Sequence, residues 1–137
     1  MKAVLDTNVL VSGLINPMGP PGRIVDWIRA GELKVVVDDR ILAEYADVLR
    51  RPTMRTYFTA SDAYAILDFL VHCAEHAVAV ELVQNLPDPD DAPFLEVALA
   101  AGVPLVTGNK RHFPANRRKG CRVLSAKEFI GLTAEGD

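Results

Sequence analysis

Three carboxylates lie within four consecutive residues of the chain, at Asp88, Asp90 and Asp91, directly before an apolar segment. Two carboxylates about 4 Å apart repel by roughly 4 kcal/mol at an effective dielectric constant near 20, so a protein that gathers them holds them apart or supplies a cation. One interpretation is a turn and a helix cap, since Asp90 or Asp91 fits at or beside the N-cap of a helix that Pro93 opens. The other interpretation is a metal site, which requires further acidic groups at the same place.

Two other polar groups follow short apolar runs. Residues 3–5 and 103–106 are apolar without alternation, which is typical of strands buried on both faces of a parallel sheet. Asp6-Thr7-Asn8 follows the first run and Thr107-Gly108-Asn109 the second. Because ligands of open α/β sheets bind outside the carboxyl ends of the strands, both groups are expected at one edge of the sheet.

The rest of the chain alternates apolar strand and helix patterns, which predicts an α/β fold with a mostly parallel central sheet covered by helices. Further strands are predicted at residues 33–37, 77–80 and 121–124, and helices at 21–30, 40–50, 61–73, 93–101 and 126–132. Residues 13–22, rich in Gly and Pro, are predicted to form a loop. Ser125 and Glu128 have the spacing of a capping box, and residues 134–137 are expected to form a frayed tail.

Glu44 lies on the helix predicted over residues 40–50, about 40° around the helix axis from Val48, at the border of its apolar stripe. The helix alone would place Glu44 at the edge of the surface. In a parallel sheet, however, Glu44 can reach the edge that carries Asp6 and the acidic run. Oxygen ligands without His or Cys select a hard cation such as Mg²⁺ or Mn²⁺ over zinc.

A hard cation that keeps its waters can supply a hydroxide and neutralise charge on a phosphate, so the predicted chemistry is phosphodiester hydrolysis. A rival is a phosphatase or phosphoacceptor domain with Asp6 as nucleophile. The Asp-x-Asp motif expected for that class is absent, because position 8 is Asn.

Four motifs, in order and spacing, resemble the PIN domain family: residues 5–10 (LDTNVL), 41–44 (ILAE), 88–96 (DPDDAPFLE) and 106–110 (VTGNK). The resemblance spans nearly the whole chain, and residues 123–129 (VLSAKEF) match the usual end of its toxin branch. It implies a single PIN-like domain over residues 1–137, built as a three-layer α/β/α sandwich. It also implies a Mg²⁺- or Mn²⁺-dependent ribonuclease, and many members act as toxins of VapC-like toxin-antitoxin pairs.

Position by position, the resemblance assigns metal binding and catalysis to Asp6, Glu44 and Asp91. It assigns orientation of these carboxylates to Asn8 and Thr107. Asp88 and Asp90 match the acidic run that precedes the Phe-Leu-Glu of the motif.

Asn109 stands where the family usually has Asp, so a fourth carboxylate is missing. Its amide can still orient a metal-bound water, and the expectation is one ion held by the other three carboxylates. The leading alternative is a PIN module that binds RNA or a protein partner without cutting.

A basic segment follows the second strand-end group. Between residues 110 and 127 there are seven Lys or Arg and no Asp or Glu, and subtracting this charge from the net −3 leaves −10 for the rest of the chain. Contact with RNA phosphate is predicted for five of them, and a solvated surface is the alternative: Lys110, Arg111, Arg117, Arg118 and Lys119.

Composition limits the class of protein. A chain of 137 residues with 50% hydrophobic residues is long enough for one domain with a proper core, and no apolar run approaches the ~20 residues that cross a bilayer. A soluble cytoplasmic protein without membrane contact is expected, with Cys73 and Cys121 reduced and mostly buried. The resemblance adds two partners, an antitoxin encoded beside the protein and a second copy in a homodimer.

Overall fold

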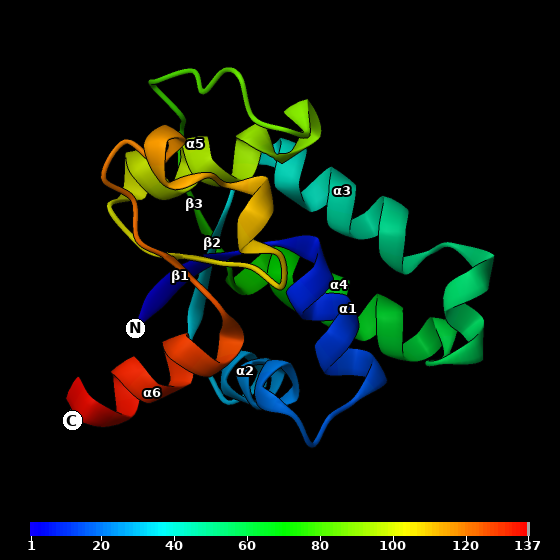
Figure 1. Cartoon of the computed structure of the whole chain (residues 1–137). Coiled ribbons are helices and arrows are strands. Elements are labelled where there is room, and N and C mark those ends of the chain that lie inside the picture. Colours follow the sequence, from blue (N-terminus) through cyan, green and yellow to red (C-terminus); the bar gives the residue numbers. More distant parts are fainter. Residues whose placement is uncertain (137) are drawn as a thin grey trace.

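Five short strands form one parallel sheet at the centre of the molecule (Figure 1). The computed structural model describes residues 1–136. The strands are β1 (Lys2–Leu5), β2 (Lys34–Val37), β3 (Glu75–His76), β4 (Leu105–Val106) and β5 (Val123–Leu124), in the order β3-β2-β1-β4-β5. Each neighbouring pair is parallel. The predicted α/β class with a parallel sheet is therefore confirmed, and β1 and β4, which precede the two polar groups, are neighbours.

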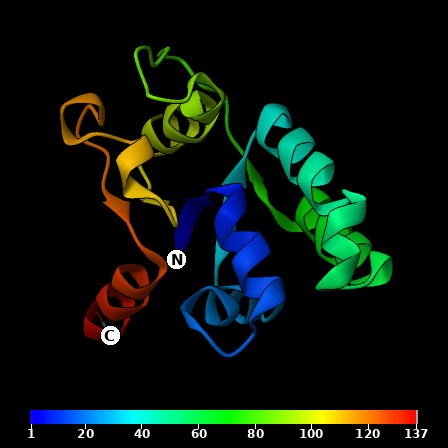
Figure 2. The ribbon, with the colours of Figure 1, turned by 45° about the vertical axis from the view of Figure 1, so that its right-hand side comes forward.

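Helices cover both faces of this sheet. They are α1 (Thr7–Ile15), α2 (Pro20–Arg29), α3 (Asp39–Leu49), α4 (Ala60–Cys73), α5 (Ala92–Ala101) and α6 (Ala126–Gly136). Figures 1 and 2 show α1, α3 and α4 on one side of the sheet and α5 on the other, as in a three-layer sandwich. This follows from right-handed crossovers, because the chain moves outward from β1 to β3 and then returns to β4 and β5 on the other side. The last helix, α6, lies beside α2, where the ring centroids of Trp27 and Phe129 are 6.3 Å apart. No helix among residues 1–136 has the length and apolar character of a membrane span.

The helix ends follow local capping chemistry. The Asp38 side chain accepts a hydrogen bond of 3.0 Å from the backbone N–H of Ile41, so α3 begins beside the end of β2. The predicted capping box of α6 is confirmed, since Ser125 and Glu128 each accept the other's backbone N–H at 3.0 and 2.9 Å. This helix continues through Gly136, into the residues expected as a frayed tail, and Asp137 lies outside the described residues.

The loop predicted for residues 13–22 is wrong at both ends, since α1 extends to Ile15 and α2 begins at Pro20. Its glycines serve helix packing instead. A Cβ on Gly13 would lie 2.6 Å from the carbonyl oxygen of Pro21, and one on Gly22 would lie 2.2 Å from that of Pro17. Gly13 therefore permits the close approach of α1 and α2, and Gly22 permits the approach of α2 to the residues that connect the two helices.

The segment after α4 also differs from the prediction. The strand is Glu75–His76 rather than residues 77–80, because these two residues pair with the last two of β2 and the partner strand ends there. Val78 and Val80, whose apolar character suggested a strand, are 82% and 88% exposed. Cys73 is exposed rather than buried, since the buried face of α4 ends at Leu70. Cys121 is half-buried, and burial raises the pKa of its thiol.

Candidate metal and catalytic site

Asp6 lies directly after β1 and is held by the neighbouring strand. Its backbone N–H donates to the carbonyl oxygen of Val106 at 2.9 Å, and its carboxylate accepts a hydrogen bond of 2.8 Å from the hydroxyl of Thr107. The Asn8 amide lies 3.4 Å from the same carboxylate oxygen. Only 5% of Asp6 is exposed, so these contacts fix an almost buried carboxylate at the carboxyl edge of the sheet.

The two polar groups that follow β1 and β4 contact each other directly. The side-chain oxygen of Asn8 accepts the backbone N–H of Gly108 at 2.9 Å. The Thr107 hydroxyl, which donates to Asp6, accepts the backbone N–H of Asn109 at 3.1 Å. Residues about a hundred positions apart in the chain therefore share one hydrogen-bonded cluster.

Glu44 reaches this cluster from α3. Its carboxylate accepts a hydrogen bond from the hydroxyl of Thr7, the residue after Asp6. The next residue, Tyr45, is fully buried and donates its phenolic hydrogen to the carbonyl oxygen of Leu5 at 2.5 Å. Two consecutive residues of α3 are thus bonded to the end of β1, which keeps Glu44 at the sheet edge.

The three aspartates before α5 make different contacts. The Asp88 side chain accepts the backbone N–H of Asp90 at 3.0 Å and caps the short 3-10 turn Pro89–Asp91. Asp90 is exposed. Asp91 occupies the N-cap position of α5, but its carboxylate does not cap the helix and lies against the imidazole of His112, with 2.9 Å between Oδ2 and Nδ1. The turn-and-cap interpretation therefore describes Asp88, whereas Asp91 faces the cluster.

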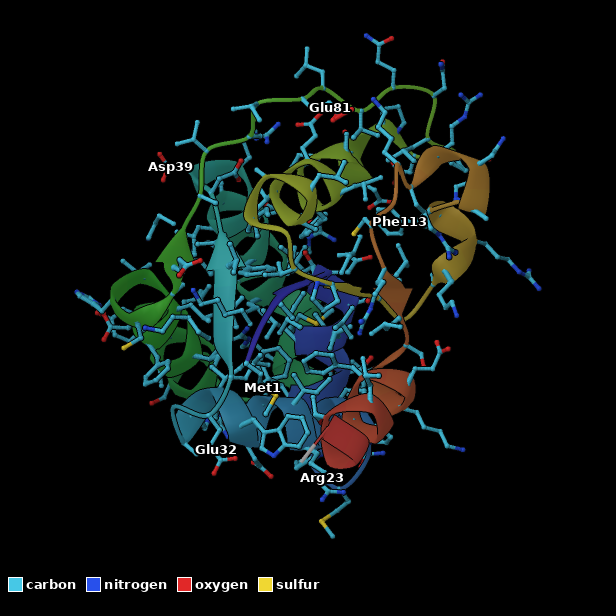
Figure 3. The ribbon with its side chains drawn as sticks, turned by 90° about the vertical axis from the view of Figure 1, so that its left-hand side faces the viewer. Met1, Arg23, Glu32, Asp39, Glu81 and Phe113 are labelled. Carbon is cyan, nitrogen blue, oxygen red and sulfur yellow. The ribbon has the colours of Figure 1, made fainter. Side chains whose placement is uncertain are left out.

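Buried Glu96 links α5 to α3 and to the segment that leads to the acidic run. It lies one turn into α5, binds Arg40 of α3 at 2.7 Å, and accepts the backbone N–H of Val83 at 2.9 Å. Val83 belongs to the extended segment that includes Glu81 and passes over α5 in Figure 3. Glu96 thus ties α3, α5 and the segment before Asp88 together.

His112 is the residue that the sequence analysis missed. One ligand atom each from Asp88, Asp91 and His112 can be chosen so that all three lie within 4.8 Å of one another, a group able to hold a metal ion. Of the three predicted metal ligands this group includes only Asp91, and it adds a nitrogen donor to the oxygen donors that were expected. Nothing in the spacing of the motifs distinguishes His112 from His72 or His76, and only the turn after β4 brings it to Asp91.

The carboxylates of the cluster perturb each other's ionisation. Burial raises the pKa of Asp6 above its usual value. Burial, reinforced by the charges of Asp6 and Asp88, raises the pKa of Asp91 to about 6. Burial also raises the pKa of Glu44, and the charges of Asp6, Asp90 and Asp88 add to this effect. The site thus gathers negative charge that a divalent cation would neutralise, and its oxygen and nitrogen donors fit such an ion.

Replacing Asp91 by Asn is expected to stabilise the metal-free protein at neutral pH. The folded pKa of about 6 lies above the ordinary 3.8, so the ionised carboxylate destabilises the fold as the pH rises through 6, and this penalty is absent below 3.8. Thermal unfolding in EDTA should show a Tm of the variant about 4 °C above wild type near pH 8. The difference should vanish near pH 4. An equal or lower Tm near pH 8 would contradict the repulsion.

Three of the five basic residues predicted to contact RNA make ion pairs or hydrogen bonds within the protein. Lys110 pairs with Glu128 at 2.8 Å and Lys119 with Glu81 at 2.8 Å. The Arg118 guanidinium donates to the carbonyl oxygen of Phe113 at 2.7 Å. Arg111 and Arg117 are exposed.

Comparison with known proteins agrees with this arrangement. A family model described as PIN domain matches residues 2–111. The uncharacterized protein MJ1680 of Methanocaldococcus jannaschii is 33% identical over 113 residues, which cover 80% of this chain and 72% of that protein.

Two solved structures share the fold at low sequence identity. PAE2754 from Pyrobaculum aerophilum has a TM-score of 0.63 and 16% identity, covering 98% of this chain and 90% of its own. VapBC2 from Rickettsia felis, solved bound to a DNA fragment from their promoter, has a TM-score of 0.57 and 14% identity, covering 91% and 98%. With a family model that matches most of its length, the chain belongs to the PIN domain family.

Proposed function

We propose that this protein is a Mg²⁺- or Mn²⁺-dependent endoribonuclease that hydrolyses RNA phosphodiester bonds. The observation that supports the proposal is that Asp6, Glu44 and Asp91 come from three separate segments, that burial raises the pKa of each, and that the charge of Asp6 adds to the rise at Glu44 and Asp91. Bringing carboxylates together in a partly buried place lowers the stability of the fold. Carboxylates with perturbed pKa values are typical of catalytic sites. Membership of the PIN domain family supports the same function.

The residues of the cluster have separate tasks in this proposal. Asp6, Glu44 and Asp91 would hold the ion, which would supply an activated water and neutralise charge on the phosphate. Thr107 and Asn8 orient the Asp6 carboxylate, and Thr7 orients Glu44. Asp88 shapes the turn that presents Asp91. Asn109 and Asp90 stay at the edge of the site as outer groups.

Metal removal tests the proposal. Purified protein should cleave RNA in Mn²⁺, stop when EDTA is added, and regain activity when Mn²⁺ is restored. Cleavage that continues in excess EDTA would contradict metal dependence.

Asn109 favours a second candidate, a PIN module that binds RNA or a protein partner without cutting, because it removes one carboxylate from the site. Calorimetric titration with Mn²⁺ distinguishes the two. A three-carboxylate enzyme should bind Mn²⁺ measurably, whereas a module that serves only as a binding surface has no need of the ion.

We further propose that the protein is the toxin of a toxin-antitoxin pair, with an antitoxin protein and a second copy of itself as partners. The structural likeness to VapBC2 supports this assignment. Co-purification with the product of the adjacent gene and the mass of the purified assembly would test both partners.

RNA binding is expected to depend on Arg111 and Arg117, two exposed arginines of the basic segment, of which Arg111 directly precedes His112. Changing both to Glu should weaken binding and lower the slope of log K against log salt by about 1.4, since each single-strand phosphate contact contributes ~0.7. Filter binding or anisotropy across a salt series measures this slope. The matched control is Arg29→Glu with Lys34→Glu, exposed residues elsewhere in the chain that give the same change in charge. An equal loss in the control would mean bulk attraction rather than a specific surface.

A further inference from the structure

We propose that His112 is a metal ligand, supplying a nitrogen donor, together with Asp88 and Asp91, to the divalent ion held at Asp91. The inference rests on the metal site of the proposed function, but not on RNA cleavage. Its consequence is a preference for a transition metal ion such as Mn²⁺ over Mg²⁺.

The distances in the group fit metal ligation. The 2.9 Å between His112 Nδ1 and Asp91 Oδ2 is close to the ~3.0 Å that separates two adjacent ligands of an octahedral ion at metal–ligand distances near 2.1 Å. Asp88 completes the group, with all three ligand atoms inside 4.8 Å. The pair that now shares a hydrogen bond is therefore spaced to share an ion.

The exposure of the two side chains places the imidazole on the solvent side. The His112 side chain is 40% exposed, whereas that of Asp91 is 11% exposed. The imidazole is therefore accessible to an ion from solvent, whereas most of the Asp91 carboxylate is covered.

The turn that carries His112 is fixed at both ends. Thr107 is fully buried and bonded to Asp6, and Phe113 is fully buried immediately after the histidine. Between them, the backbone N–H of His112 donates to the carbonyl oxygen of Asn109 at 3.2 Å. Figure 3 labels Phe113, which lies between this segment and the body of the molecule. Ligands held by a rigid frame need little ordering when the metal binds.

Donor chemistry then sets the choice of metal. Imidazole nitrogen is a good ligand for transition metals, whereas Mg²⁺ prefers carboxylate, carbonyl and water oxygens. Residue 109 is an uncharged asparagine, and the imidazole of His112 offers a nitrogen donor three residues later. A nitrogen donor adds a ligand without adding the negative charge that favours Mg²⁺.

Mn²⁺ electron paramagnetic resonance tests the ligand directly on the purified full chain without a polyhistidine tag. Spin-echo modulation should show coupling of Mn²⁺ to an imidazole nitrogen in wild type, and this coupling should disappear in His112→Gln. Titration of free Mn²⁺ should give an affinity at least about tenfold weaker in His112→Gln, while Mg²⁺ affinity, measured by competition, stays within about threefold. His72→Gln, a change of an exposed histidine on α4, is the matched control and should keep both the coupling and the affinity.

Three results would overturn the inference, and the first two separate it from the proposed function. Mn²⁺ that binds wild type without imidazole coupling would remove His112 from the site and leave the carboxylate site intact. No Mn²⁺ binding to wild type would remove both. Coupling that persists in His112→Gln would also reject the assignment.

Discussion

Asp91→Asn is expected to reduce Mn²⁺-dependent RNA cleavage by about 10²–10³-fold. Several kcal/mol of transition-state stabilisation come from a correctly held divalent ion, and each 1.36 kcal/mol is a factor of ten in rate. The amide would remove the negative charge of a proposed metal ligand that lies beside Asp88 and His112 and whose pKa is raised by the charge of Asp6. Initial rates of cleavage of a fluorescent RNA at saturating Mn²⁺ measure the effect.

The loss of activity can be separated from unfolding, because the same variant is expected to be more stable than wild type when metal-free. Asp47→Asn is the matched control, since Asp47 is an exposed residue on α3 that pairs only with Arg51 among the described residues. It should cleave at the wild-type rate. Equal rates for Asp91→Asn and wild type would remove the catalytic claim.

Gly22→Ala is expected to destabilise the protein by ~2–4 kcal/mol. The added methyl would lie 2.2 Å from the carbonyl oxygen and 2.5 Å from the Cα of Pro17, so backbone rather than a flexible side chain must move. Denaturant unfolding followed by circular dichroism measures the change in free energy of unfolding.

Gly131→Ala serves as the matched control for that substitution. Gly131 is also inside a helix, α6, but a Cβ there meets nothing within 4 Å among the described residues. It should stabilise the protein by about 0.5–1 kcal/mol through helix propensity. A Gly22→Ala protein as stable as wild type would show that the backbone at Pro17 can move away from α2 without cost.

The fold could be predicted because its strands are apolar on both faces and end in polar residues. The runs before Asp6 and Thr107 indicated parallel strands, and their pairing follows from the fold class. Two glycines of residues 13–22 were wrongly interpreted as part of a loop. Gly13 and Gly22 lie in a stretch with the composition of a loop. Gly13 packs against α2 and Gly22 against Pro17 of the connecting segment, and no local sequence pattern contains these distances.

The candidate site could be predicted in part, for a similar reason. Residues at strand ends are placed by topology, whereas Glu44 and His112 are placed by contacts with other segments. The partner of Glu44 is Thr7 on α1, and that of His112 is Asp91 before α5. Periodicity gives the face of a helix but not the neighbour that it meets, so the motif resemblance identified Glu44 and nothing in the sequence identified His112.

The hydrogen bond between Thr107 and Asp6 joins residues that are 101 positions apart. During synthesis on the ribosome, Asp6 is made about a hundred residues before Thr107, its hydrogen-bond partner. A truncated or stalled nascent chain therefore lacks an assembled centre. If the protein cuts RNA as proposed, it would gain this activity only after Thr107 has been synthesised and has reached Asp6.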